Sequence, residues 1–198
     1  MISSVSERTY RAMYRLLDRV SPIDDDCGRL CGAKCCTCTY EPEDLDFHGE
    51  GDVNADGYMG LFLLPGEEKI HEGEEDWIDW GYIMAEDYCY PDSWEGKVYM
   101  IQCRTAPVCP REKRPIQCRT FPLAPHIDED GVFHIILYCD ELPYSCPLIS
   151  DGIELNEDFI QATYTVWRHL LRDPRIFDLV EADSEDRLWE GRKIKVLR

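Results

Sequence analysis

The chain lacks the long apolar segments and the positive charge that mark membrane-spanning and nucleic-acid-binding proteins. None of its apolar runs approaches the about 20 residues that span a bilayer. Forty acidic residues against 21 Lys and Arg give a formal net charge of −19, which argues against nucleic acid and anionic membranes as partners. The N-terminal segment has no uninterrupted apolar core of a signal peptide, so we expect a cytoplasmic protein.

The short motifs of several common enzyme classes are also missing. The sequence contains no serine or cysteine nucleophile motif, no phosphate-binding loop and no dinucleotide fingerprint. Residues 52–57 begin like a calcium-binding EF-hand loop, but Leu63 stands where that loop needs a bidentate carboxylate. The five histidines lack the paired spacing of metal ligands. Whether the protein is an enzyme therefore stays open.

Cysteine, in contrast, is abundant and clustered. The chain has 11 cysteines, and ten of them fall into two groups. The first group has the spacing C-x3-C-x3-C-C-x-C and consists of Cys27, Cys31, Cys35, Cys36 and Cys38. The second group consists of Cys103, Cys109, Cys118, Cys139 and Cys146. Cys89 stands apart between two tyrosines, and we expect it to be a buried free thiol.

Clustered thiols of this kind indicate metal binding. Adjacent cysteines such as Cys35 and Cys36 rarely form a disulfide, because a trans peptide resists the required geometry. In a reducing compartment, cysteine clusters are more often metal-binding or catalytic than disulfide-bonded. Thiolates select zinc, cuprous copper or iron-sulfur clusters, each normally closed by four ligands. The ten clustered cysteines therefore predict one or two centres of zinc or an iron-sulfur cluster, with the division of ligands left open.

Positive charge gathers beside the second cysteine group although the chain as a whole is acidic. Five cations bracket this group, namely Arg104, Arg111, Lys113, Arg114 and Arg119. A centre of four thiolates around zinc, or an oxidised four-iron cluster, carries a net charge of about −2. Neighbouring cations lower thiol pKa values and offset this charge. An ordinary basic loop is the alternative explanation.

We expect a single domain over residues 1–198. Residues 1–22 would form an N-terminal helix, residues 24–150 the metal-binding core, and residues 155–198 a helical region in which Pro174 starts a short helix. The predicted fold class is α+β: a small irregular domain with short antiparallel strands and peripheral helices, organised around thiolate metal centres. In such a domain metal binding contributes directly to folding.

Alternation and turn residues predict where the strands lie. Short strands are expected at residues 58–64 and 98–103, and the aromatic, acidic stretch between them is expected to be irregular. The clearest hairpin joins residues 123–127 to residues 132–138 through an acidic turn with glycine. A helix is expected at residues 156–172, and the C-terminal tail is expected to add a further strand.

Several of these segments together resemble the cysteine-rich family of zinc- or iron-chelating proteins named for its CxxCxxCC motif. The matching segments are CGRLCGAKCC from Cys27, RPIQCRTFPL from Arg114, and Cys146-Pro147. Leu63-Leu-Pro-Gly-Glu67 is also similar to a segment of some members. The resemblance covers about residues 27–149 and implies a compact metal or iron-sulfur domain. Some members of this family are described as iron-sulfur oxidoreductases and others as flagellin lysine N-methylases.

Three functions follow from this sequence. The first is a metal-binding protein whose centre is structural or transfers electrons, with metal ions and a redox or protein partner. The second is an iron-sulfur enzyme of methyl-transfer or redox type, acting on a protein or small molecule in a pocket lined by Arg119, Phe121 and residues 77–94. The third is metal storage or trafficking. The C-x3-C-x2-C spacing of Cys31, Cys35 and Cys38 also resembles the radical S-adenosylmethionine signature, but the strand-helix series of that fold is missing.

Overall fold

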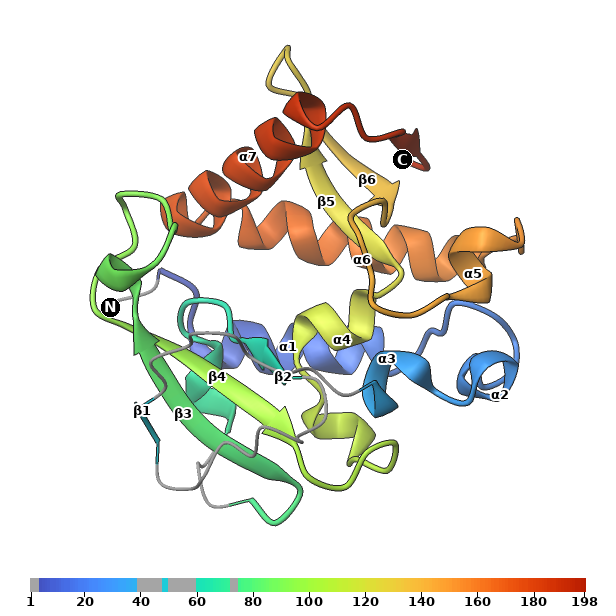
Figure 1. Cartoon of the computed structure of the whole chain (residues 1–198), viewed down its shortest axis with the longest axis horizontal. Coiled ribbons are helices and arrows are strands. Elements are labelled where there is room, and N and C mark those ends of the chain that lie inside the picture. Colours follow the sequence, from blue (N-terminus) through green and yellow to red (C-terminus); the bar gives the residue numbers. More distant parts are fainter. Residues whose placement is uncertain (1–3, 39–47, 50–59, 72–74) are drawn as a thin grey trace.

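The computed structural model of the chain describes residues 4–38, 48–49, 60–71 and 75–198. Two small antiparallel sheets with helices around them make up this part, which confirms the predicted α+β class (Figure 1). No helix within these residues is long and apolar enough to cross a membrane. The calcium-loop-like segment at residues 52–57 lies outside them.

The elements follow one another along the chain without a repeated unit. The α-helices are α1 (Glu7–Leu17), α2 (Gly28–Cys31), α3 (Lys34–Thr37), α4 (Ile116–Thr120), α5 (Pro147–Ser150), α6 (Glu157–Leu170) and α7 (Pro174–Trp189). The 3-10 helices are η1 (Glu67–Ile70), η2 (Ala85–Asp87) and η3 (Arg111–Lys113). The strands are β1 (His48–Gly49), β2 (Gly60–Phe62), β3 (Ile78–Met84), β4 (Lys97–Cys103), β5 (Leu123–Ile127), β6 (Phe133–Leu137) and β7 (Lys195–Val196).

The C-terminal half is built around the predicted hairpin. Strands β5 and β6 pair antiparallel, with His126 opposite His134, and the C-terminal tail adds β7 beside β6 as predicted. Helices α6 and α7 lie against this sheet (Figure 1), so every residue of β5 is buried. The helix predicted at residues 156–172 is confirmed as α6. Helix α7 is longer than the short helix predicted after Pro174, and Asp173 caps its first turn.

The second sheet has the strand order β1-β3-β4-β2. Strand β3 corrects the sequence analysis, which expected this aromatic and acidic stretch to be irregular. All seven residues of β3 pair with β4. The charged and aromatic side chains of β3 also find partners along the sheet. Asp79 pairs with Arg104 across the strands, at 2.7 Å from Nε, and Trp80 stacks on Tyr99 with ring centroids 5.3 Å apart. Because polar side chains of this strand pair with polar side chains nearby, its sequence does not show a simple alternation of apolar and polar residues.

A fully buried carboxylate, Glu67, joins the N-terminal helix to the segment that carries Cys118. Its Oε1 atom accepts hydrogen bonds from the Tyr14 hydroxyl and from the Ile116 amide, both at 2.7 Å. Its Oε2 atom accepts a hydrogen bond from the Leu64 amide at 3.2 Å. Burial raises the pKa of Glu67, and the three hydrogen bonds oppose that shift. Helices α1, η1 and α4 therefore meet at one acceptor group.

A buried arginine, Arg119, makes the second connection at this junction. Its side chain is 3% exposed and forms an ion pair with Asp18 at the end of α1. The guanidinium also lies 4.2 Å from the Tyr14 ring centroid. It donates hydrogen bonds to the Arg114 carbonyl and, at 2.6 Å, to the Arg111 carbonyl. Since these contacts satisfy the guanidinium, Arg119 is a structural residue in this junction.

Replacing Glu67 with glutamine should destabilise the fold. The amide group retains one oxygen for two of the three donors, but its NH₂ group then faces a backbone N–H, which leaves a buried donor unpaired. We expect Glu67→Gln to lower the free energy of unfolding by about 1–3 kcal/mol, as measured by urea denaturation. Glu68→Gln is the matched control, because that side chain is partly exposed, and it should change stability by less than about 0.5 kcal/mol. Equal stability of the two variants would contradict this role of Glu67.

His71 gives the junction a predictable response to acid. This histidine is 5% exposed, its Nε2 lies 3.4 Å from the Tyr14 hydroxyl, and its ring packs near Trp77 and Trp80. Burial lowers the pKa of His71 from 6.5 to about 4. The folded protein therefore keeps this side chain neutral where the unfolded chain already binds a proton.

Stability should fall as the pH decreases from 6.5 towards 4, because the unfolded state takes up the proton first. A shift of this size corresponds to about 3 kcal/mol between the two ends of the window. Denaturation curves across that range should show the loss in the wild-type protein and a smaller loss in His71→Gln. If His71→Gln shows the same pH dependence of stability as the wild type, groups other than His71 cause the acid sensitivity.

Candidate metal centre

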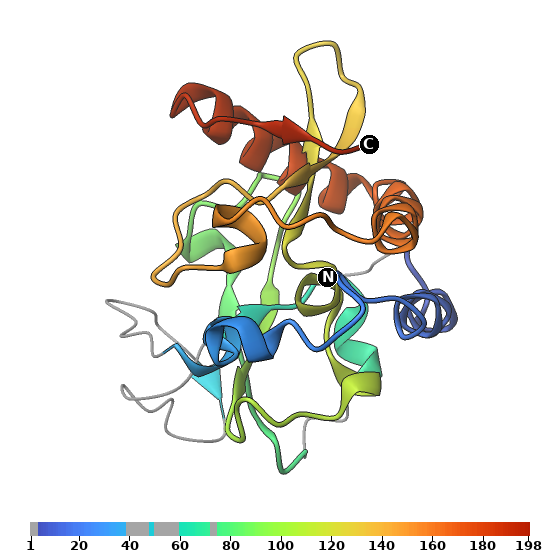
Figure 2. The ribbon, with the colours of Figure 1, turned by 90° about the vertical axis from the view of Figure 1, so that its right-hand side faces the viewer.

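Eight of the ten predicted ligands gather on one side of the molecule. They come from α2, α3, the end of β4, the segment from η3 to α4, and the start of α5. Figure 2 shows α2, α3 and α5 on the side opposite α1 and α6, which are seen end-on. The eight residues are Cys27, Cys31, Cys35, Cys36, Cys103, Cys109, Cys118 and Cys146. The fold thus brings the two cysteine groups of the sequence together.

Four of these thiols surround a guanidinium, and we call them the Arg114 group: Cys36, Cys103, Cys109 and Cys118. Arg114 donates a hydrogen bond from Nε to the Cys109 sulfur at 3.0 Å. Desolvation is the main cause that raises the pKa of the Cys118 thiol, and the charges of the other three thiols raise it further. Desolvation likewise raises the pKa of Cys103 to about 11, again with contributions from Cys36 and Cys109.

The Cys146 group contains Cys27 and Cys31, at the two ends of α2, and Cys146, before α5. Desolvation is the largest cause that raises the pKa of Cys27, and Cys146 and Cys31 both add to it. Desolvation also raises the pKa of Cys146, and Cys31 contributes there too. Cys146 precedes Pro147 at the start of α5, while Cys27 precedes the first residue of α2. Two short helices therefore present these thiols from opposite ends of the chain.

Cys35 lies between the two groups. Its sulfur is 3.9 Å from the sulfur of Cys36, and it interacts electrostatically with both Cys27 and Cys118. The hydrogen bond with Cys35 is the main cause that lowers the pKa of Cys36 to about 7, and Arg114 acts in the same direction. Cys35 therefore contacts the Arg114 group through Cys36 and interacts with the Cys146 group through Cys27.

The backbone between α2 and α3 turns sharply to make this arrangement. Gly32 has φ of 69° and Ala33 has φ of 54°, so two consecutive residues are left-handed. Such a conformation costs a non-glycine residue roughly 1–2 kcal/mol. Neither α2 nor α3 has a buried residue. Apolar packing therefore contributes little to holding this segment against the rest of the fold.

As the side chains are placed, no three His, Cys, Asp or Glu groups in the described part of the chain meet in a geometry that could hold an ion. The thiols form two neighbourhoods and not closed coordination shells. Their chemistry nevertheless suits a soft metal, because the Arg114 group has four sulfur donors and the Cys146 group has three, with Cys35 between the two groups. Closing either shell requires the thiol side chains to turn toward a common point.

The remaining cysteines have other surroundings. The charged neighbours of Cys139 are Asp140, Arg187 and Arg192, and Cys38 ends the α3 segment in an extended conformation. Both stay predicted ligands. The expectation that Cys89 is buried was wrong, because this thiol is exposed. The next residue, Tyr90, stacks on Trp94 with ring centroids 4.9 Å apart and so takes the inner side of the turn.

The basic residues of the sequence analysis divide by role. Arg114 alone among them donates a hydrogen bond to a thiol in the part of the chain that the structure describes. The others hold the scaffold: Arg104 binds Asp79, Arg111 donates to the Val20 carbonyl, Lys113 pairs with Glu75, and Arg119 pairs with Asp18. The basic stretch is thus mainly structural, with one residue directed at the sulfurs.

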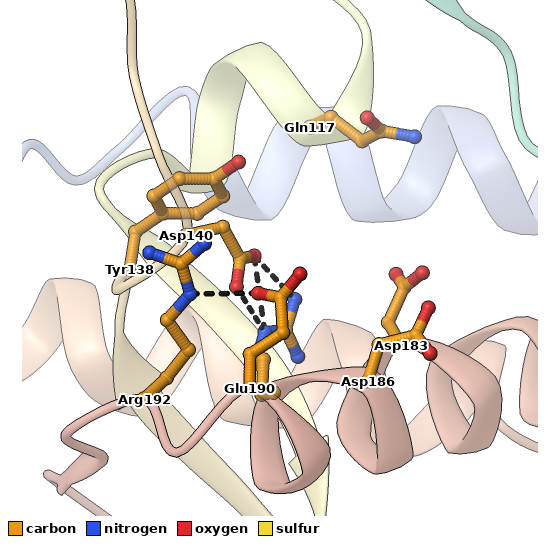
Figure 3. Close-up of a pocket in the computed structure, with 8 residues that line it drawn as sticks. Gln117, Tyr138, Asp140, Asp183, Asp186, Glu190 and Arg192 are labelled. Atoms are coloured by element: carbon orange, nitrogen blue, oxygen red, sulfur yellow. Dashed lines mark hydrogen bonds and ion pairs between the residues drawn. The ribbon is translucent and has the colours of Figure 1, made fainter.

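A polar cavity of about 420 Å³ lies next to the helix that carries Cys118 (Figure 3). Its lining residues are Gln117, Tyr138, Asp140, Asp183, Asp186, Arg187, Glu190 and Arg192. Arg187 binds Asp140 at 2.9 Å, and burial raises the pKa of Asp183 to about 6. The pocket predicted around Arg119, Phe121 and residues 77–94 does not coincide with this cavity, since its walls come from α4, α7 and the end of β6.

Searches against protein-family models, curated proteins and solved structures gave no match for this chain. The assignment of a site therefore depends on the geometry of the chain itself. Sequence reasoning found the cysteines and the basic stretch but did not identify Glu67 or single out Arg114. Glu67 belongs to the Leu-Pro-Gly-Glu segment and Arg114 to the Arg-Pro-x-x-Cys-Arg segment, so these two motifs were the sequence signals that could have identified both residues.

Proposed function

We propose that the chain is a metal-binding protein with two thiolate centres, each holding zinc or an iron-sulfur cluster in a structural or electron-transfer role. The observation that carries the proposal is the convergence of eight cysteines from five separate segments on one side of the fold. The Arg114 group supplies four ligands to one centre. The Cys146 group and Cys35 supply four to the other, with Cys38 and Cys139 as further candidate donors.

The environment of the thiols is consistent with this proposal. None of the eleven cysteines, all of which lie in the described part of the chain, forms a disulfide, which fits a reducing compartment. Metal ions are the proposed ligands, and an electron-transfer role adds a redox or protein partner. Nucleic acid is an unsuitable partner for a chain of net charge −19. Metal storage or trafficking is a further alternative, because it predicts labile, exposed thiolates, and Cys35 and Cys118 are exposed whereas Cys146 is buried.

An iron-sulfur enzyme is the second candidate, and the cavity beside Cys118 favours it. Gln117 lines the cavity and is the residue before Cys118, so a substrate bound there would lie close to the Arg114 group. A methyl-transfer or redox reaction on a protein or small molecule needs a coordination position that the protein leaves open. Two centres fully closed by four cysteines each would count against this alternative.

Metal analysis of the protein purified without oxygen tests the proposal. We expect either about two zinc ions per chain and no visible colour, or iron and sulfide in equal amounts with a brown spectrum. Cys109→Ser should lose the metal of the Arg114 group, Cys146→Ser should lose the metal of the other centre, and each should keep the remaining one. Cys89→Ser is the matched control and should keep both.

The outcome that contradicts the proposal is a chain that carries no metal and binds none when reduced and exposed to zinc, or to iron with sulfide. Hydrogen exchange of residues 24–38 gives an independent reading. Metal binding should slow exchange in this segment, because its own apolar packing is weak, whereas amides of α6 should change little.

A further inference from the structure

The two thiol groups differ in their contact with Arg114. In the Arg114 group, the guanidinium binds Cys109 directly and interacts with Cys36 and Cys118. In the Cys146 group, two carboxylates act on the thiols: Asp26 raises the pKa of Cys27, after desolvation, and Asp151 contributes at Cys146. Asp26 also acts on Cys36 of the Arg114 group. Arg114 also acts on Cys27, but as the smallest contribution there. The two groups therefore differ in their ability to carry negative charge.

The backbone of Arg114 is held in place by its neighbours. The residue is half-buried, and its carbonyl accepts a hydrogen bond from the buried Arg119. Pro115 follows it and restricts the backbone before α4. Because an arginine side chain does not lose its proton in proteins, this positive charge is permanent. The guanidinium is thus positioned against the Cys109 sulfur before any metal arrives.

We propose that Arg114 makes the Arg114 group the tighter of the two centres, so that it fills with metal first. This inference rests on the proposed metal-binding function. Four thiolates around a dication carry a net charge of about −2, which a fixed cation with an N–H···S hydrogen bond stabilises. Asp26 and Asp151 oppose the same charge at the other centre. Arg114 is a positioning residue in this scheme, because it acts through Cys109 and does not bind the metal.

Titration of the reduced, metal-free chain with Co²⁺ tests the inference, followed by competition with Zn²⁺. Thiolate-to-cobalt charge-transfer absorption reports each step of binding. We expect two steps in the wild-type protein, and Cys109→Ser should remove the tighter one. Arg114→Gln should weaken that step by about 10–100-fold, the usual effect of removing a residue that orients a metal ligand, and should leave the weaker step unchanged.

Two further variants separate charge from general disruption. Arg114→Lys keeps the positive charge but loses the planar fork, so its effect on the tighter step should be smaller than that of Arg114→Gln. Arg104→Gln removes the same charge beside Cys103 in sequence, but Arg104 pairs with Asp79, so both steps should stay unchanged. Circular dichroism checks that each variant is folded. If Arg114→Gln does not fold, the comparison of Arg114→Lys with the wild-type protein tests the inference.

Three results would overturn the inference while leaving metal binding intact. They are an unchanged tighter step in both Arg114 variants, an equal loss in both steps, and loss of the tighter step in Cys146→Ser in place of Cys109→Ser. A wild-type chain that binds neither Co²⁺ nor Zn²⁺ would instead remove the proposed function, and the inference with it. The two failures are therefore distinguishable in one titration series.

Discussion

The buried carboxylate of Glu67 is the interaction on which the meeting of α1, η1 and the Cys118 helix α4 depends. It accepts hydrogen bonds from α1 through Tyr14, from its own turn through Leu64, and from α4 through Ile116. A carboxylate in the interior is costly unless donors surround it, so these segments reach low energy only when they meet. Cys118 lies two residues after Ile116, and its position is fixed by the same contacts.

One short segment combines the charge, the ligand and the structural support of the proposed centre. Arg114 directs a permanent cation at the sulfurs, Cys118 supplies one of them, and Arg119 holds the Arg114 carbonyl and pairs with Asp18. This arrangement resolves the conflict between a strongly acidic chain and a cluster of thiolates, because a single buried network brings positive charge to the place where negative charge would develop. The three roles act together because these residues lie within one short segment of the chain.

Local patterns predicted the elements that have a local sequence signal, namely the hairpin of β5 and β6 and helix α6. Strand β3 escaped prediction because Asp79 and Trp80 are satisfied by partners on β4, which the sequence around them does not reveal. The role of Arg119 was hidden for a related reason, since its partners lie on α1 and before α4, far from it in the sequence or outside any motif. The grouping of the thiols depends on long-range contacts such as Cys27 with Cys146, and spacing along the chain carries no information about them.

The fold divides into a part that packs by itself and a part that does not. Helix α6, helix α7 and the hairpin share one large apolar core, whereas α2 and α3 contribute no buried residue. Asn156 ties the start of the thiol-bearing segment to α6, through the Ser21 carbonyl and Asp24, but no residue from 25 to 38 is buried. Left-handed Ala33 adds a further conformational cost. Since apolar burial offsets little of the entropy of ordering this segment, a metal that joins its cysteines to those of α4 and α5 would supply the missing free energy, and binding and local folding would be one event.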